Sequence, residues 1–184
     1  LVGAGLFVRT LLNLQRVDPG FNSQNLLLFG VQPGLIGYKD EKLQQLYEQL
    51  GSRLETVPGV QAVTFSRNTL LSQGASSRSV FLREALNSPP DSEGRIRASG
   101  EGYLHQVREN FLEAMQIPLL AGRTMRVQDD SKSPRVVVVN ETFAKLYFPN
   151  DNALGKRFTF DPTKPDEVEI VGIDRRRAAG QGLS

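Results

Sequence analysis

IPLLAGRTMRVQDDSKSPRVVVVNETFAKLYF, residues 117–148, carries more structural information than any other part of this sequence. Val136–Val139 is an unbroken β-branched run, which is typical of a strand covered on both faces because polar alternation is absent. Asn140 ends the run, and its side chain is suited to accept hydrogen bonds from the free N–H groups of a following helix. Glu141 lies in the first turn of that helix, and Pro149 ends it after Phe148.

Further elements are expected next to this stretch. Glu109–Met115 fits a short helix, and Gly155–Phe160 with Glu167–Ile173 fits a hairpin joined by the loop Pro162–Asp166. We predict one core for these elements, made of the valines of 136–139 together with residues from the helix and the hairpin. Its expected members are Ile117, Leu119, Phe143, Leu146, Tyr147, Phe158, Ile170 and Val171.

The N-terminal third predicts a β-α-β unit. Asn25–Val31 is rich in apolar residues and Val60–Ser66 alternates, so each is expected to be a strand. Asp40 is placed to cap a helix running to about Val57. Apolar residues at three- and four-residue spacing give that helix one apolar face: Leu43, Leu46, Tyr47, Leu50 and Leu54.

Residues 68–102 have little periodicity, and the Ser, Gly and Pro clusters there predict loops. Ser79–Arg83 and Tyr103–Val107 are expected as strands that flank them. Leu1–Val8 is apolar but too short to cross a membrane, which needs about 20 residues. The residues alone leave open whether it is the end of a membrane helix or an amphipathic helix on a soluble core.

Composition excludes several classes of function. The 184 residues suffice for one domain or two small lobes, and a net charge of +2 gives little support to nucleic-acid binding. The absence of cysteine excludes disulfides and thiolate chemistry, and fits either the cytoplasm or a bacterial periplasm. Because the first residue is Leu1, we take the chain as a piece of a longer protein.

Two places in the sequence are candidates for a catalytic or metal site, His105 and Asp129-Asp130. His105 is the single histidine, and no acid is spaced to orient it, so a structural role is favoured. Asp129-Asp130 offers carboxylates to a cation but lacks the spaced oxygen ligands of a calcium loop, which favours a solvated loop. No catalytic, cofactor-binding or metal-binding residue is therefore assigned.

Other motifs are incomplete or have a structural explanation. The serines at 72, 76, 77 and 79 lack the context of a hydrolase nucleophile. Gly155-Lys156 lacks the rest of a phosphate loop, so the chain is not expected to bind ATP itself. Asn140-Glu141-Thr142 matches a glycosylation acceptor, although a helix cap explains it equally well. Arg175–Arg177 is interpreted as a solvated terminus or a lipid-headgroup contact.

Five motifs in a fixed order carry a resemblance to a known family: IPLLAGR, an acidic DD loop, VVVVNETFAKLYFP, ALGKRF and EIVGI. The sequence resembles the MacB-like periplasmic core domain of MacB-like and FtsX-like ABC transporter permeases. It is most similar in look to the duplicated permeases of acidobacteria, whose leader into this domain resembles residues 1–27. The resemblance covers nearly the whole chain, and the motifs are specific in combination.

The resemblance implies an α+β, two-lobed extracytoplasmic domain. Residues 1–24 would be the end of a transmembrane helix and a linker, residues 25–67 a porter-like β-α-β part, and residues 68–184 a sabre-like mixed α/β lobe with a C-terminal tail. Such a domain is not an enzyme and needs no cofactor. It couples cytoplasmic ATP hydrolysis mechanically to export or extraction of a substrate.

The resemblance also implies partners and a location. The partners are the permease's transmembrane helices and a separate or fused cytoplasmic ATPase, with a periplasmic adaptor or a second permease copy as further candidates and no nucleic acid. The location is the bacterial cytoplasmic (inner) membrane, with this domain on the periplasmic side. Two alternatives stay open: a free-standing periplasmic binding or adaptor module, and a hydrolase using His105, Asp129 or Asp130.

The sequence departs from the family pattern at several places. Relatives commonly have Gly-Tyr-Phe where this chain has Asn110-Phe111-Leu112, and Met-Gly-Ile where it has Met115-Gln116-Ile117, which predicts a different turn geometry there. The second porter β-α-β unit of the family is missing from the sequence. We therefore expect open apolar strand edges and self-association in solution, to which Leu1–Leu14 and Leu26–Phe29 contribute.

Overall fold

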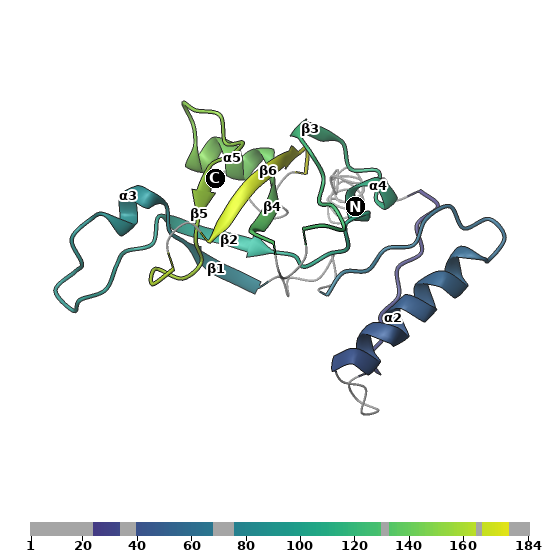
Figure 1. The fold of residues 1–184 in the computed structure, drawn as a ribbon. Coiled ribbons are helices and arrows are strands. Elements are labelled where there is room, and N and C mark those ends of the chain that lie inside the picture. The colour runs from purple at the N-terminus through teal and green to yellow at the C-terminus, as the bar shows by residue number, and fades with distance from the viewer. Residues whose placement is uncertain (1–23, 34–39, 68–75, 130–132, 165–166, 177–184) are drawn as a thin grey trace, which may run out of the picture.

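A computed structural model describes residues 24–33, 40–67, 76–129, 133–164 and 167–176. The fold is mixed α/β, as predicted. A sheet with helix α5 (Glu141–Tyr147) lies in the middle of the molecule, and the excursion carrying helix α3 (Arg83–Leu86) projects to one side. Helix α2 (Asp40–Glu55) lies on the opposite side, away from the sheet (Figure 1).

Strand β6 (Val168–Asp174) is the centre of the main sheet. Strand β4 (Arg135–Asn140) pairs with it in parallel along its whole length, from Val168 to Asp174. The other edge of β6 is shared by two short antiparallel partners. Strand β5 (Arg157–Phe158) pairs with the start of β6, and strand β3 (Leu119–Gly122) pairs with its end. The predicted hairpin of β5 and β6 is confirmed.

The predicted strand-to-helix passage is also confirmed. Asn140 has the extended backbone of a helix N-cap (ψ 163°), and its side-chain oxygen accepts from the Phe143 N–H at 2.8 Å. Lys145 forms an ion pair with Glu141 one turn earlier, which supports the exposed face of this short helix. The helix ends at Tyr147, two residues before Pro149.

A second, two-stranded antiparallel sheet is formed by β1 (Ser76–Val80) and β2 (Gly100–Leu104). It joins the main sheet through reciprocal backbone hydrogen bonds between Phe81 and Thr159, at 2.9 and 3.1 Å. Strands were predicted at 79–83 and 103–107. The observed strands β1 and β2 begin and end about three residues earlier in the chain. Between β1 and β2 the chain forms α3 and a projecting loop, in which the Asp91 side chain accepts from the Glu93 and Arg95 N–H groups at 2.9 Å.

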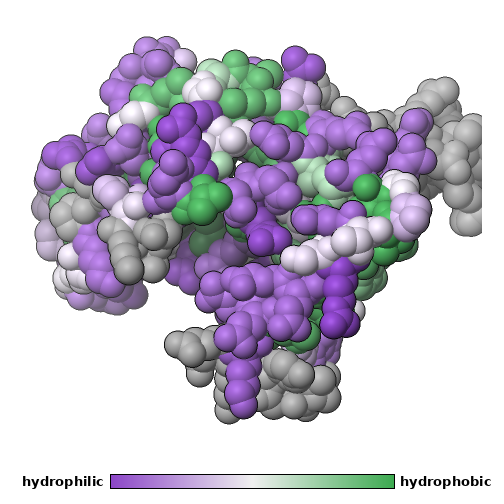
Figure 2. Space-filling view, turned by 45° about the vertical axis from the view of Figure 1, so that its right-hand side comes forward, coloured by the Kyte–Doolittle hydropathy of each residue, from purple (hydrophilic) through white to green (hydrophobic). Residues whose placement is uncertain are grey.

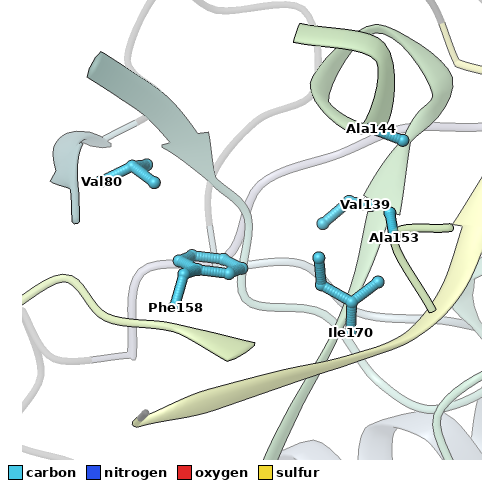
Figure 3. Close-up of a cluster of buried hydrophobic side chains, with 6 residues drawn as sticks. All are labelled: Val80, Val139, Ala144, Ala153, Phe158 and Ile170. Carbon is cyan, nitrogen blue, oxygen red and sulfur yellow. The ribbon is translucent and has the colours of Figure 1, made fainter. Parts of the chain in front are cut away.

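One apolar cluster lies between α5, the main sheet and the two-stranded sheet (Figure 3). Its buried members are Val80, Val139, Ala144, Ala153, Phe158 and Ile170. Two glycines of β2 make this packing possible, because a side chain at Gly100 would collide with the Tyr147 ring and one at Gly102 would press on Val80 and Phe143. The Tyr147 hydroxyl donates to the Glu101 carbonyl at 2.9 Å, which ties α5 to β2.

The glycines of LLAGR and EIVGI have a shared structural role. Gly122 and Gly172 face each other in the register of β3 and β6. A Cβ on Gly172 would collide with the Arg123 carbonyl, and one on Gly122 with the Val171 carbonyl. Gly122 also has a φ of 77°, in the left-handed region that favours glycine. The two motifs therefore specify a close crossing of backbones.

The prediction of a single core is wrong. Because successive residues of β4 point to opposite faces, Val137 and Val139 pack in the cluster of Figure 3, whereas Val138 packs on the other face of the sheet. Ile117 and Leu119 belong to that second cluster. Leu146 is exposed on the outer face of α5. The expectation that β4 is covered on both faces holds.

The two predicted N-terminal strands are wrong within the described residues. Residues 26–32 and 60–65 form no ladder, and only Ser66 makes an isolated bridge, to Val107. Helix α2 is present, and its predicted apolar face is half-buried, with Tyr47 edge-on to Phe65 at 5.3 Å between ring centres. Figure 2, which brings this side of the molecule forward, shows hydrophobic residues as separate patches among hydrophilic ones.

The turn after helix α4 (Phe111–Ala114) keeps a glycine-like conformation. Gln116 has a φ of 51°, in the left-handed region where non-glycine residues are uncommon. The glutamine therefore adopts the backbone that a glycine would favour, and the predicted change of the turn does not follow.

Candidate functional site

The second apolar cluster is centred on α4 and is here called the α4 hub. Its buried members are Phe111, Leu112, Met115 and Ile117. Glu109–Met115 was predicted as a short helix, and α4 forms within that range. Four half-buried residues from distant parts of the chain pack on it: Leu26, Val107, Leu119 and Val138. The α4 hub therefore joins the N-terminal segment, the chain after β2 and two strands of the main sheet.

The end of β6 reaches the same hub. Asp174 is fully buried, and both of its oxygens accept from the Arg176 guanidinium, Oδ2 at 2.7 and 3.0 Å and Oδ1 at 3.1 Å. Arg176 in turn lies 6.0 Å from the centre of the Phe111 ring. A buried carboxylate needs such a partner, because an unpaired charge away from water is very unfavourable. The ion pair between Asp174 and Arg176 thus holds the end of β6 against α4.

The connection to α2 consists of a few specific contacts between residues 63–67 and 106–110, here called the junction. The Arg67 N–H donates to the Gln106 carbonyl at 2.9 Å, and the Arg108 N–H donates to the Phe65 carbonyl at 3.1 Å. The Asn110 side-chain amide donates to the Val63 carbonyl at 2.9 Å. Arg108 also lies over the Phe65 ring at 5.4 Å.

Buried polar atoms without a hydrogen-bond partner gather at this place. Among the described residues these atoms are Thr64 Oγ1, His105 Nδ1 and Asn110 Oδ1, and each is at the junction or one residue from it. Burial lowers the pKa of His105 below its ordinary value, and the positive charge of Arg176 lowers it further. His105 is therefore held neutral beside the hub, without the acid partner that a general base requires.

The predicted acidic pair does not form a cation site in the described part of the chain. Both oxygens of Asp129 accept from the Arg123 guanidinium, at 2.7 and 3.0 Å, and one also accepts from the Arg126 N–H at 2.8 Å. These bonds hold the pKa of Asp129 below its usual value. The carboxylate is thus used to close the loop after β3. Asp130 lies outside the described residues.

The remaining candidates have structural partners or lie outside the described residues. The Ser77 hydroxyl donates to Glu101 at 2.9 Å, Lys156 pairs with Asp151, and Asn140 caps α5. Arg176 pairs with Asp174 and lies over Phe111 of the α4 hub, which corrects the prediction of a solvated terminus for this residue, whereas Arg175 is exposed. Arg177, Ser72 and the Leu1–Val8 segment lie outside the described residues, as does the side chain of Ser76.

Metal clusters and membrane-spanning helices are two further features that a domain of this size can carry. Within the described residues, no three His, Cys, Asp or Glu side chains come together in a way that would hold a metal ion. No helix in the described part of the chain is both long and apolar enough to cross a membrane.

The model of the MacB-like periplasmic core domain matches residues 5–184, and the chain belongs to this family. No curated protein matches the chain. The predicted resemblance is confirmed.

Two solved structures are similar to the chain. One is the periplasmic region of MacB from Actinobacillus actinomycetemcomitans, at 20% identity and a TM-score of 0.48, with 70% of this chain and 50% of that chain covered. The other is the extracellular domain of the noncanonic ABC-type transporter YknZ from Gram-positive bacteria, at 18% identity and a TM-score of 0.48, with 70% and 57% covered. The chain thus spans about half the length of these two chains.

Sequence reasoning missed the residues that build the junction and the hub contact. Asn110 donates to the Val63 carbonyl, 47 positions away, and Arg176 pairs with Asp174, two residues earlier, while it lies over the distant Phe111 ring. A signal that points to this ion pair is Asp174, an acid directly after the predicted strand Glu167–Ile173, whose Ile170 and Val171 are expected in the core.

Proposed function

We propose that this chain is the extracytoplasmic part of an ABC-type permease in the bacterial inner membrane, and that it couples ATP hydrolysis mechanically to export or extraction of a substrate. The observation that carries the proposal is the family match over residues 5–184. The α4 hub supports it, because the N-terminal segment, the connection to α2 and the end of β6 all meet there. A displacement imposed on one of these segments would reach the others through packed side chains.

In this proposal the parts of the chain have the roles that the family resemblance implies. Residues 25–67 belong to a porter-like part and residues 68–184 to a sabre-like lobe, while transmembrane helices and a cytoplasmic ATPase lie in other parts of the transporter. An adaptor or a second permease copy is a further partner. The chemistry is then performed by the ATPase, and the described residues transmit movement.

Topology provides the first test. The full-length protein that contains this chain should fractionate with the cytoplasmic membrane, and protease added to spheroplasts should digest the domain. Release of the intact protein by osmotic shock would contradict the proposal and support a free-standing periplasmic module.

Coupling provides the second test. In the full-length permease reconstituted with its ATPase in lipid nanodiscs, trapping the ATP-bound state should change hydrogen exchange at residues 106–119. A partner ATPase that binds ATP without hydrolysing it separates binding from turnover. Unchanged exchange at the hub in every nucleotide state would contradict mechanical coupling through this domain.

A further inference from the structure

We propose that Asn110 is a hinge switch, whose side chain either holds residues 63–67 on the α4 hub or turns to cap α4 and releases them. This inference rests on the geometry of the chain and not on the proposed function. It concerns movement between α2 and the sheet within the isolated domain.

The first observation is that Asn110 occupies an N-cap position without capping. It directly precedes α4, yet no cap hydrogen bond is made, and its ψ of 7° is far from the extended value. Asn140 is the matched example in the same chain, with a ψ of 163° and a bond to the Phe143 N–H. An asparagine at this position normally accepts from the first turn of its helix. In Asn110 the amide nitrogen instead donates to the Val63 carbonyl, and Oδ1 is buried without a partner.

The second observation is that two buried polar atoms at the junction have no hydrogen-bond partner among the described residues. Thr64 Oγ1 and Asn110 Oδ1 lie on the two sides of the same contact. A buried polar atom is more favourable when it has a partner. Capping of α4 satisfies Oδ1, and release of residues 63–67 exposes the Thr64 hydroxyl to water.

The third observation is that few other contacts among the described residues hold the junction. Apart from the Asn110 bond, these are the Ser66–Val107 bridge with its two backbone hydrogen bonds, the Arg67 side chain donating to the Gln106 side chain at 2.9 Å, and Arg108 over the Phe65 ring. The segment 105–109 lies between β2, which is paired with β1, and α4, which is packed in the hub. Rotation of Asn110 ψ toward the extended region, which capping requires, would break the bond from Asn110 to the Val63 carbonyl and allow residues 63–67 and α2 to move relative to α4. Hinges of this kind consist of a few residues at the end of an element that absorb a dihedral change.

The test uses paired spin labels, for which the chain is suited because it contains no cysteine. Arg53→Cys with Lys145→Cys reports the distance between the exposed faces of α2 and α5. Leu120→Cys with Lys145→Cys is the control pair, since β3 and α5 both belong to the main sheet unit. We expect two α2–α5 distances in the parent protein and one distance for the control pair.

Two substitutions should shift the populations in opposite directions. Asn110→Asp can accept hydrogen bonds but cannot donate to the Val63 carbonyl, so it should favour the released arrangement. Thr64→Val removes the unpaired hydroxyl and should favour the described arrangement. Thr163→Val is the matched control, because the Thr163 hydroxyl has a partner in Asp161 and lies far from the junction in the chain. An unchanged control-pair distance shows that each variant is folded.

One α2–α5 distance that is the same in the parent, Asn110→Asp and Thr64→Val proteins would overturn the proposal. That result is expected if a trapped water satisfies the three buried atoms in a fixed junction. Failure of the membrane topology or nucleotide experiments would leave this result untouched, because the spin-label experiment needs neither membrane nor ATP.

Discussion

Two apolar runs of this chain differ in strand pairing and in burial. Val136–Val139 lies in β4, paired with β6 and packed on both faces of the sheet. Leu26–Val31 pairs with no strand among the described residues, and Leu27 and Phe29 are 81% and 59% exposed. Apolar composition is therefore not sufficient for a strand. A strand also needs a neighbour for its N–H and C=O groups, and of these two runs the valine run alone has one among the described residues.

The largest expected effect separates these two runs directly. Val139→Asp places a charge in the cluster of Figure 3 and should lower the free energy of unfolding by about 3–5 kcal/mol. Leu28→Asp, on the exposed run, should change it by less than about 0.5 kcal/mol. Urea titrations of both variants measure the difference. Equal effects would show that the two runs are buried alike.

Two glycines give the next contrast. Gly172→Ala would drive a methyl group into the Arg123 carbonyl, so we expect a loss of about 2–3 kcal/mol in the free energy of unfolding. Gly30 has no atom within 4 Å of the position that a Cβ would take. Gly30→Ala should therefore be neutral or slightly stabilising. Thermal melts would contradict the close-crossing interpretation if Gly172→Ala unfolded at the temperature of the parent.

Self-association should follow from the exposed run. The chain is expected to associate in solution, and Leu27→Lys with Phe29→Lys should reduce this, because charges oppose strand pairing between copies. Leu146→Lys, which alters an exposed leucine of α5, should have little effect. Light scattering, with and without residues 1–15, measures the association. A clean monomer in every form would refute the open-edge prediction.

The turn after α4 offers a smaller, stabilising change. Gln116→Gly relieves a left-handed backbone, although glycine also gains entropy in the unfolded chain. The net gain should be up to about 1 kcal/mol. Gln128→Gly in an exposed turn, where φ is negative, should instead be slightly destabilising. A destabilised Gln116→Gly protein would show that the glutamine side chain contributes more than its backbone costs.

The smallest effect concerns pH at the contact between the two regions. The folded pKa of His105 is lowered, so the unfolded state binds a proton more readily than the folded state. The stability contributed by neutral His105 is present above the ordinary pKa of 6.5 and is lost as pH falls from there through the lowered folded pKa. Denaturant midpoints between pH 7.5 and pH 5 should show this loss in the parent and less of it in His105→Gln.

Local chemistry determined most of the main sheet from the sequence alone. The β4–α5 passage follows from the β-branched run and the Asn140 cap, and the β5–β6 hairpin follows from two short runs around a loop. These signals lie within a few residues of the elements that they specify. The family motifs LLAGR and EIVGI also have a local structural basis. A Cβ at Gly122 or Gly172 would collide with a backbone carbonyl of the neighbouring strand segment.

Only the tertiary structure decided the rest. Whether Leu26–Val31 becomes a strand depends on a partner that is distant in sequence, and whether Val138 shares a core with Val139 depends on which elements cover each face of the sheet. The bond from Asn110 to Val63 and the contact of Arg176 with Phe111 join residues that no local pattern relates. Local patterns set the type of an element, because they reflect backbone preference and side-chain periodicity. Its neighbours are set by packing among distant segments, and those neighbours formed the α4 hub and the junction.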